Sequence, residues 1–377
     1  MHDKHSPAVD CCERAMPGIR GLAPYEPGRP ISDIEREYGV SNIIKLASNE
    51  SPLGPAPGAL EAARAALDDI AMYPDGNAFA LKQALAARHG VDAEYITLGN
   101  GSNDVLDLIA RVFLGPGRNA VFSRHAFAVY PLVTVAAGAQ VREAAPVAAD
   151  GDMPYGHDTR AMAEAIDDKT GVVFIANPNN PTGTWLTADA LRELFDRIPR
   201  HTVIVLDEAY CEYVDDARYP DGSSWLAQYP NLIVTRTFSK AWGLAGLRVG
   251  YSVCAPQIAD LLNRVRQPFN VNLVAQAAAL ASLDDAAHMR RAVALNNSER
   301  EKLCAGLHAL GLHYLPSAAN FVCVQVPDSP RVYEALLHAG IIVRPVDGYG
   351  LPGFLRVTVG LPEHNQRLLA ALEKVLA

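Results

Sequence analysis

The sequence predicts an α/β protein in which a mainly parallel sheet covered by helices is followed by a smaller α+β domain. Between about residues 91 and 255, short β-rich runs alternate with segments of helical periodicity. Several of these runs are apolar throughout, as strands that are covered on both faces must be. The length of 377 residues is sufficient for two packed units.

Six runs in this region are expected to form the strands of the large domain. They lie at 95–98, 120–122, 172–175, 203–206, 232–235 and 248–251. Helices are expected at 59–69, 78–89, 105–114 and 188–198. Thr187 precedes the last of these as an N-cap, and Gly90 ends the second. This alternation favours a mainly parallel sheet.

The two ends of the chain differ from this central region in composition. The N-terminal residues are rich in Pro and Gly and are predicted to form an arm that packs on another surface. After Pro268, long helical stretches precede strands at 320–326, 341–344 and 354–359 and a helix at 332–338. The predicted division is therefore an arm, a large domain and a small domain, with bounds 1–44, 45–267 and 268–377.

Composition and charge argue against several classes of function. The formal net charge of −9 leaves no basic face for a nucleic-acid backbone, so small molecules are the expected partners. Six cysteines lie without paired spacing and eleven histidines form no ligand pattern, which predicts neither a disulfide framework nor a metal site. The sequence shows no signal peptide and no run long enough to cross a bilayer. A cytoplasmic location is expected.

Lys240 is the most informative residue of the chain. Hydroxyl groups at Thr237 and Ser239 flank it, small and apolar residues follow, and Arg248 comes later in the same segment. Desolvation and a nearby cation both lower the pKa of an amine, which prepares a lysine to form a Schiff base with an aldehyde cofactor. A solvated surface lysine is the structural alternative, so the other segments decide.

A second segment indicates an anion site. After the first predicted strand, the chain passes through Gly101 to Ser102 and Asn103, where the next helix opens. Backbone N–H groups at a helix start can bind a phosphate, and Ser239 and Arg248 can add donors. A glycine turn capped by Ser102 explains these residues equally well when they are taken alone.

A carboxylate follows the buried run 203–206, at the end of a strand where α/β sheets form their ligand sites. Asp207 can there cap a helix, bind a metal or pair with the protonated ring nitrogen of a pyridine cofactor. In the last case the ring withdraws electrons from the α-carbon of a substrate, and Tyr210 can reach the phenolic oxygen of the ring.

Two more segments follow predicted strands. The loop 177–183 holds three asparagines and two prolines, and Asn180 is its best candidate to donate to a cofactor oxygen. Phe127 and Tyr130 follow the run 120–122 and offer a ring that can stack on a planar cofactor, although aromatic residues near strands more often pack in the core.

Together these segments resemble the fold-type I pyridoxal-phosphate aminotransferases and, within them, the histidinol-phosphate aminotransferase family. The likeness covers nearly the whole chain and rests on an ordered set of motifs. They lie at 46–50, 52–54, 73–76, 99–104, 177–183, 207–210, 239–240, 245–248, 320–322, 341–344 and 355–356. The resemblance implies a seven-stranded sheet in the large domain and pyridoxal 5′-phosphate (PLP) as cofactor.

The resemblance also implies roles for the candidate residues. Lys240 would be the Schiff-base lysine and the catalytic acid and base, Asp207 the partner of the ring nitrogen, and Phe127 the stacking ring. Asn180 and Tyr210 would donate to the ring hydroxyl oxygen. Ser102, Asn103, Ser239 and Arg248 would hold the phosphate, with Tyr73 reaching over from the other subunit of an obligate homodimer. Gly101 and Thr237 would also belong to the cofactor-binding residues.

The substrate site is implied in the same way. Arg356 matches the residue that binds the substrate anion, and the residues expected beside it are Arg344, Asn320, Tyr25 and Asn49. The chain departs from the family at Ser51, where the family commonly has Asn, and this departure concerns the substrate more than the cofactor.

The implied reaction is a ping-pong transamination that converts L-histidinol phosphate and 2-oxoglutarate to imidazole acetol phosphate and L-glutamate, a step of histidine biosynthesis. An aromatic amino-acid aminotransferase and a phosphothreonine-type decarboxylase on the same scaffold remain open. A non-catalytic PLP-binding regulator ranks below them, because the lysine, the acid and the arginine are all present.

Overall fold

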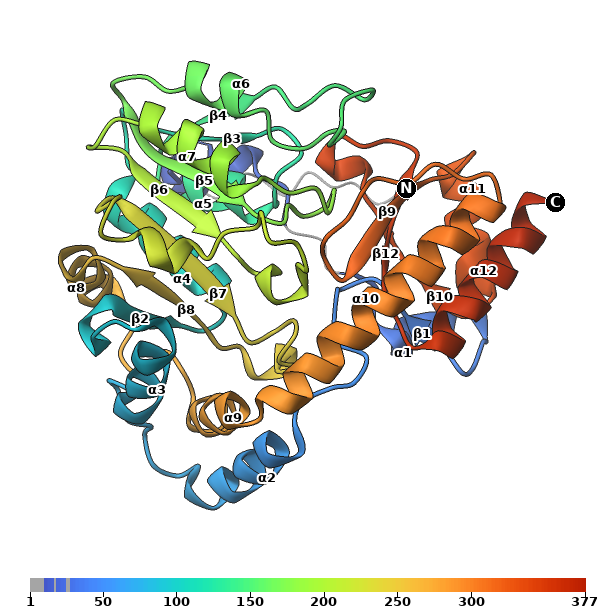
Figure 1. Cartoon of the computed structure of the whole chain (residues 1–377), viewed down its shortest axis with the longest axis horizontal. Coiled ribbons are helices and arrows are strands. Elements are labelled where there is room, and N and C mark those ends of the chain that lie inside the picture. Colours follow the sequence, from blue (N-terminus) through green and yellow to red (C-terminus); the bar gives the residue numbers. More distant parts are fainter. Residues whose placement is uncertain (1–9, 17, 25–27) are drawn as a thin grey trace.

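The computed structural model describes residues 10–16, 18–24 and 28–377. Its large sheet has seven strands in the order β2-β8-β7-β6-β5-β3-β4 (Figure 1). The strands are β2 (Ile96–Gly99), β3 (Asn119–Ser123), β4 (Gln140–Ala144), β5 (Thr170–Ala176), β6 (Val203–Asp207), β7 (Leu232–Thr237) and β8 (Gly250–Cys254). Only β8 runs antiparallel to its neighbours β2 and β7. The predicted mainly parallel sheet is confirmed.

Helices cover both faces of this sheet. They are α2 (Pro57–Ala66), α3 (Phe79–His89), α4 (Ser102–Phe113), α5 (Val129–Ala136), α6 (Thr159–Glu164), α7 (Ala188–Arg197), α8 (Pro256–Val265) and α9 (Leu273–Asp284). Along β5, Val172 and Phe174 pack with α4, α5 and α8, whereas Val173 and Ile175 pack with α7 and α9. Both faces of the strand are therefore apolar because both are buried.

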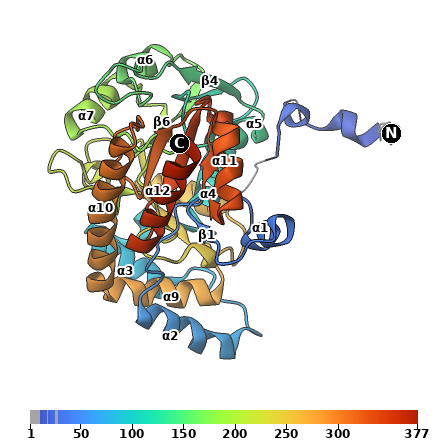
Figure 2. The ribbon, with the colours of Figure 1, turned by 90° about the vertical axis from the view of Figure 1, so that its right-hand side faces the viewer.

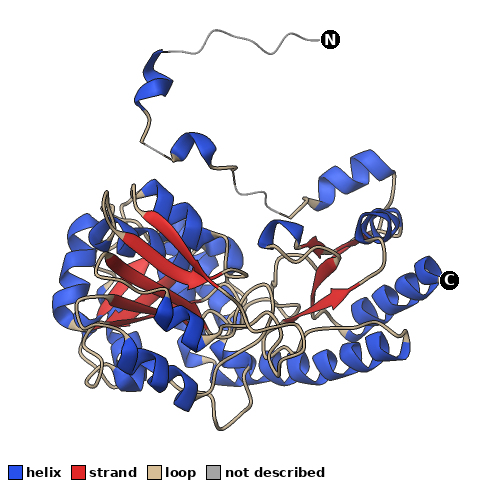
Figure 3. Cartoon of the chain, turned by 90° about the horizontal axis from the view of Figure 1, so that it is seen from above, coloured by secondary structure: helices blue, strands red, loops and turns tan. Residues whose placement is uncertain are grey.

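The small domain contains a second sheet, seen beside the first in Figure 3. Strands β11 (Arg344–Pro345), β12 (Phe354–Thr358) and β9 (Phe321–Gln325) are antiparallel, and β1 (Ile44–Lys45) pairs in parallel with β10 (Ile341–Ile342). The helices α1 (Ile31–Tyr38), α11 (Ser329–His338) and α12 (Pro362–Leu376) surround them. The 24-residue helix α10 (Ala286–Ala309) runs from the large domain to the small one (Figure 1).

Short 3-10 helices complete the fold: η1 (Asp10–Arg14), η2 (Ile19–Gly21), η3 (Leu67–Asp69), η4 (Ala93–Tyr95), η5 (Cys211–Tyr213), η6 (Gly222–Trp225), η7 (Ala245–Leu247) and η8 (Asp347–Tyr349). The described part of the arm, with η1 and η2, extends from the body beside α5 (Figure 2). Met16 lies against Gly138, and Val135 of α5 lies against Gly18.

Several elements differ from the sequence-based expectation. Strand β4 was not predicted, because its sequence Gln-Val-Arg-Glu-Ala lies half-exposed at the sheet edge and lacks an apolar run. Arg248 was placed in a strand, but its φ of 58° is left-handed and β8 begins only at Gly250. The predicted strand 341–344 is split between two sheets as β10 and β11.

The domain boundaries remain a prediction. The packing of helix α9 and of strand β1 bears on them. Helix α9 lies after the proposed boundary but packs against α2 and α3 on the large-domain side. Strand β1 lies before the large sheet yet pairs with β10 of the small domain, so the segment that follows it runs between the two domains.

Candidate active site

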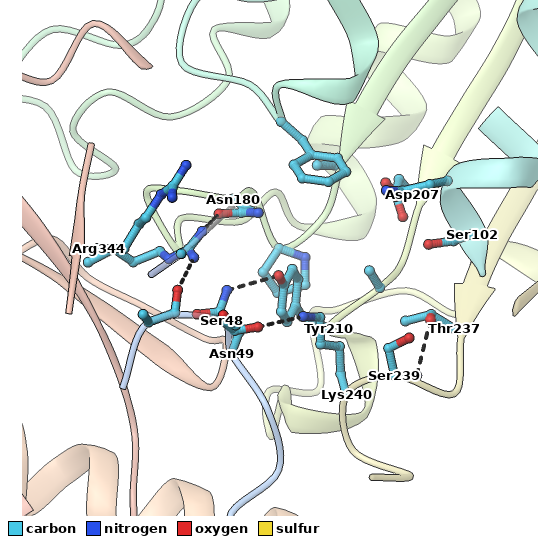
Figure 4. Close-up of a pocket in the computed structure, with 18 of the residues that line it drawn as sticks. Ser48, Asn49, Ser102, Asn180, Asp207, Tyr210, Thr237, Ser239, Lys240 and Arg344 are labelled. Atoms are coloured by element: carbon cyan, nitrogen blue, oxygen red, sulfur yellow. Dashed lines mark hydrogen bonds between the residues drawn. The ribbon is translucent and has the colours of Figure 1, made fainter. Parts of the chain in front are cut away.

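A cavity of about 200 Å³ lies where the carboxyl ends of β5, β6 and β7 face the small domain (Figure 4). Most of the predicted site residues line it: Asn49, Ser102, Asn103, Phe127, Asn180, Asp207, Tyr210, Thr237, Ser239, Lys240, Arg248, Arg344 and Arg356. The register explains part of this convergence, because Asp207 pairs with Ala176 of β5 and with Thr235 of β7. Parallel strands thus bring distant segments to one edge.

Four predicted residues are not among those that line the cavity. Gly101 lies against Arg248, which does line the cavity, and Asn320 is buried with its Nδ2 donating to the carbonyl oxygen of Asn49 at 3.0 Å. Tyr73 is 81% exposed and stacks on Phe269, with ring centroids 4.6 Å apart. Tyr25 lies outside the described residues.

One end of the cavity has a set of donors that suits a phosphate. Helix α4 begins at Ser102, and no side chain caps it in the described part of the chain. Arg248 Nη1 donates to Ser239 Oγ at 3.2 Å, so the guanidinium lies beside this helix start. A Cβ at Gly101 would be 2.3 Å from Arg248 Nη2, so only glycine permits this approach. Charge and helix-end N–H groups together favour an anion here.

Asp207 is the carboxylate at the middle of the cavity, at the end of β6. Its two oxygens accept hydrogen bonds from Tyr130 Oη at 2.8 Å and from Thr235 Oγ1 at 3.1 Å. Burial raises the pKa of Asp207, while these two hydrogen bonds lower it. A buried carboxylate of this kind is stabilised by a cation placed against it, such as a protonated ring nitrogen.

Lys240 follows β7 and directs its amine into the cavity, where Nζ donates to the carbonyl oxygen of Ser48 at 3.0 Å. Burial is the main reason that the pKa of Lys240 falls to about 7, and the positive charge of Arg356 lowers it further. The amine also lies 5.6 Å from the centre of the Tyr210 ring. A substantial fraction of this amine is therefore neutral, and nucleophilic, at neutral pH.

The side of the cavity toward the small domain is formed by Arg356 of β12 and by the segment before α2. Arg356 donates through Nη1 to Asn180 Oδ1 and through Nη2 to the carbonyl oxygen of Ala47 at 2.8 Å. Its buried Nε has no hydrogen-bond partner among the described residues. Because the positively charged guanidinium lines the cavity, it favours an anionic ligand there.

Tyr210 and Asn49 form the corner between these two sides. Asn49 Nδ2 donates to Tyr210 Oη at 3.0 Å. Burial raises the pKa of Tyr210 to about 12, so its phenol keeps its proton and can donate it.

Three contacts were missed by sequence reasoning. Of the two alternatives for Tyr130, a stacking ring or a core residue, the structure shows the second, since the ring packs on Phe174; its hydroxyl bond to Asp207 was not predicted. Thr235 and Ser48 were not considered at all. The position of Thr235 opposite Asp207 follows from the pairing of β6 with β7, whereas nothing local to Ser48 signals its contact with Lys240.

Comparison with known proteins assigns the family. Residues 41–372 match the model of the family "Aminotransferase class I and II". The chain belongs to this family. The aminotransferase is 56% identical over 366 residues to histidinol-phosphate aminotransferase 2 of Pseudomonas aeruginosa, covering 96% of this chain and 98% of the relative. It is also 52% identical to histidinol-phosphate aminotransferase 1 of Nitrosococcus oceani, covering 96% of each chain.

Solved structures give the same assignment. The aminotransferase aligns with the crystal structure of histidinol-phosphate aminotransferase from Sinorhizobium meliloti in complex with pyridoxal-5′-phosphate at a TM-score of 0.86 and 30% identity, covering 96% of this chain and 97% of that one. Aspartate aminotransferase from Thermus thermophilus with maleate aligns at a TM-score of 0.81 and 22% identity, which shows the shared fold alone.

Two other features are absent from the described part of the aminotransferase. No helix there combines the length and the apolar character that a bilayer span requires. No group of three or more His, Cys, Asp or Glu side chains there is arranged to hold a metal ion.

Proposed function

We propose that the protein is a PLP-dependent aminotransferase that converts L-histidinol phosphate and 2-oxoglutarate to imidazole acetol phosphate and L-glutamate. The observation that carries this proposal is the single cavity that joins a lysine of lowered pKa, a buried carboxylate and two separate groups of anion-binding donors. The relatives named histidinol-phosphate aminotransferase over nearly the full chain length support the choice of substrate.

The residues present fit PLP. The donors at the start of α4, with Ser239 and Arg248, would hold its phosphate, and Asp207 would face its ring nitrogen. Phe127 would stack on the ring, and Tyr210 and Asn180 would face the ring hydroxyl oxygen. When bound, PLP supplies an aldehyde that takes up the amino group and a protonated ring that withdraws electrons from the neighbouring carbon.

Lys240 has two tasks in this proposal. Its neutral amine, available because the pKa is about 7, would be the group that bonds to the cofactor's aldehyde carbon. As a free amine, Nζ would take the proton from the donor's Cα and deliver it to the cofactor's C4′ carbon. The carbonyl oxygen of Ser48, 3.0 Å from Nζ, positions the amine for this transfer.

Arg356 is the residue that we assign to the distal anion of the substrate, with Arg344 beside it in the cavity wall. A guanidinium binds a phosphate or a carboxylate through paired N–H groups, so the same residue can serve both the phosphorylated donor and the keto-acid acceptor. An aromatic amino acid would instead place its α-carboxylate at Arg356. A phosphothreonine-type decarboxylase would orient a carboxylate over the ring.

A substrate panel tests this assignment. The protein loaded with PLP is assayed with histidinol phosphate, phenylalanine and phosphothreonine, with 2-oxoglutarate as acceptor, and kcat/KM is compared. We expect histidinol phosphate to give the highest value. A higher value for phenylalanine, or release of CO₂ from phosphothreonine, would replace the proposed donor.

Borohydride reduction tests the site separately from the substrate. Reduction of the yellow protein followed by peptide mapping is expected to label Lys240. Lys82 is a matched internal control, because burial also lowers its pKa although it lies outside the cavity. Label at Lys82, or no label at either lysine, would contradict the assigned role.

We further propose a cytoplasmic homodimer in which Tyr73 completes the phosphate site of the partner subunit. The exposed ring of Tyr73, outside its own cavity and stacked on Phe269, supports this proposal, as do the exposed apolar side chains Ile70, Met72 and Phe79 near it in the sequence. In the described part of the chain, all cysteines are unpaired thiols, which agrees with a reducing compartment.

Subunit mixing tests the shared site. Lys240→Ala and Tyr73→Ala are expected to be nearly inactive alone, whereas unfolding and refolding them together should restore about a quarter of the wild-type sites by random pairing of subunits in a C₂ dimer. Each mixed dimer then has one site with Lys240 from one subunit and Tyr73 from the other. No recovery of activity would place Tyr73 outside the partner's site.

A further inference from the structure

Thr358 is a buried hydroxyl residue that no step above uses. It ends β12, is 3% exposed and is not among the residues that line the cavity. Its Oγ1 accepts a hydrogen bond from the backbone N of Asn49 at 2.9 Å and donates to Asn49 Oδ1 at 3.1 Å. The two residues are thus joined by a reciprocal pair of hydrogen bonds.

Asn49 is held in place on all sides. Its φ of 56° is in the left-handed region, which a non-glycine residue adopts only when the surroundings impose it. Its carbonyl oxygen accepts from Asn320 Nδ2 at 3.0 Å, and its own Nδ2 donates to Tyr210 Oη at 3.0 Å. The amide oxygen therefore faces β12 and the amide nitrogen faces the cavity.

The orientation of this amide decides what the phenol can do. A tyrosine hydroxyl has one hydrogen to donate and two lone pairs that accept. In the observed orientation Asn49 occupies a lone pair of Tyr210, and the hydrogen of Tyr210 remains available to the cavity. With the amide reversed, Oδ1 would face the phenol and accept that hydrogen.

We propose that Thr358 is a positioning residue that holds the Asn49 amide in the orientation in which Tyr210 donates its hydrogen to the cofactor's ring oxygen. The inference rests on the proposed binding of PLP in this cavity. It assigns to the last residue of β12, in the small domain, an effect on a group that is carried by the large domain.

The titratable groups around the phenol come from four elements and are unchanged by substitution of Thr358. Arg356 of β12 lowers the pKa of Tyr210, Asp207 of β6 and Tyr349 of η8 raise it, and the Lys240 amine lies over its ring. A shift caused by replacing the hydroxyl of Thr358 is therefore not a direct charge effect. It must act through hydrogen bonding or through packing, and these are separated by the choice of variant.

The test is a pH titration of the visible absorption of the PLP-loaded protein. A hydrogen bond donated to the ring oxygen favours its deprotonated form, so losing that bond raises the pH midpoint. We expect Thr358→Val and Thr358→Ala each to raise the midpoint by about one pH unit, the order of one charge-assisted hydrogen bond. Thr358→Ser, which keeps the hydroxyl, should retain the wild-type midpoint.

Two controls make the outcome specific. Thr202→Val removes another buried threonine hydroxyl, one that donates to the carbonyl oxygen of Thr170 outside the cavity, and should lower the melting temperature without moving the midpoint. In a Tyr210→Phe background the Thr358 substitutions should produce no further shift, because the phenol through which they act is gone.

Three results would overturn the inference. They are an unchanged midpoint in both hydroxyl-free variants, an equal shift in Thr358→Ser, and a shift that persists in the Tyr210→Phe background. Thermal melting of the unloaded protein shows whether each variant folds. If one hydroxyl-free variant does not fold, the other still tests the inference. Absence of visible absorption from the wild-type protein would instead contradict the proposed function itself.

Discussion

The cavity has two walls of different origin. The large-domain wall consists of Asp207, Tyr210, Thr237 and Lys240, which follow or end β6 and β7 in one continuous sheet. The small-domain wall consists of Asn49, Arg344 and Arg356, whose segments meet only in the folded chain. Arg344 lies on the opposite side of the cavity from Asp207 and Thr237 (Figure 4). In the proposed function, the first wall would handle protons and electrons, and the arginines of the second would bind the far end of the substrate.

Substitutions in the two walls should therefore have different kinetic signatures. A group that stabilises charge as it develops at the reacting carbon affects the turnover of every donor alike. A group that binds the distal anion affects only substrates that carry one.

Asp207→Asn should give the largest loss. The substitution keeps the shape of the side chain but removes the charge opposite the ring nitrogen, so we expect kcat to fall about 10³-fold for phosphorylated and unphosphorylated donors alike. Steady-state kinetics with each donor measures this effect. Asp221→Asn is the control, because Asp221 pairs with Arg236 outside the cavity and its replacement should leave kcat unchanged. A loss confined to one donor would contradict the separation of the walls.

The large-domain wall could be predicted from the sequence because its residues lie directly after strands that the sequence itself identifies. An apolar run followed at once by Asp207 predicts both a buried strand and a polar residue at its end, and the polar loop 177–183, which contains Asn180, follows the apolar run of β5 in the same way. The contact between Tyr130 and Asp207 could not be read, because it joins residues 77 positions apart through the packing of α5 on the sheet.

The small-domain wall could be read only in part. Arg356 and Asn49 entered through a family resemblance, and the bond between Asn49 and Thr358 spans 309 positions without any local pattern. Strand β4 was not predicted for a related reason, since an edge strand with exposed side chains lacks the apolar run that identifies the other strands of the sheet. The position of Tyr73 depends on a surface outside its own subunit, so its role stays a prediction.

Arg356→Gln should give an intermediate loss that depends on the substrate. Removing the guanidinium should lower kcat/KM for histidinol phosphate by about 10²-fold, mostly through KM, because a charge-assisted pair of hydrogen bonds is lost. Arg356→Lys keeps the charge but not the paired geometry, so its kcat/KM for histidinol phosphate should lie between the wild-type and Arg356→Gln values. Histidinol, which carries neither a phosphate nor a carboxylate, is the comparison donor. An equal loss for histidinol would mean that Arg356 belongs functionally with the large-domain wall.

The smallest expected effect is a pH dependence that links the two walls. The neutral form of Lys240 attacks the aldehyde, and a base is neutral above its pKa, so PLP loading of the unloaded protein should accelerate about tenfold per pH unit below 7 and level off above it. A lysine at its ordinary pKa of 10.5 would keep accelerating beyond pH 9. Stopped-flow absorbance between pH 5.5 and 9.5 distinguishes these profiles.

Arg356→Gln sharpens that measurement, because the charge of Arg356 is the second-largest cause of the lowered pKa of Lys240, after burial. Removing the charge should move the midpoint of loading upward, while burial keeps it below that of an ordinary lysine. Pyridoxal, which lacks the phosphate and its ionisation, should give the same midpoint as PLP if Lys240 is the titrating group. An unmoved midpoint in Arg356→Gln would mean that burial and the other nearby cations, Arg248 among them, account for the lowered pKa without Arg356.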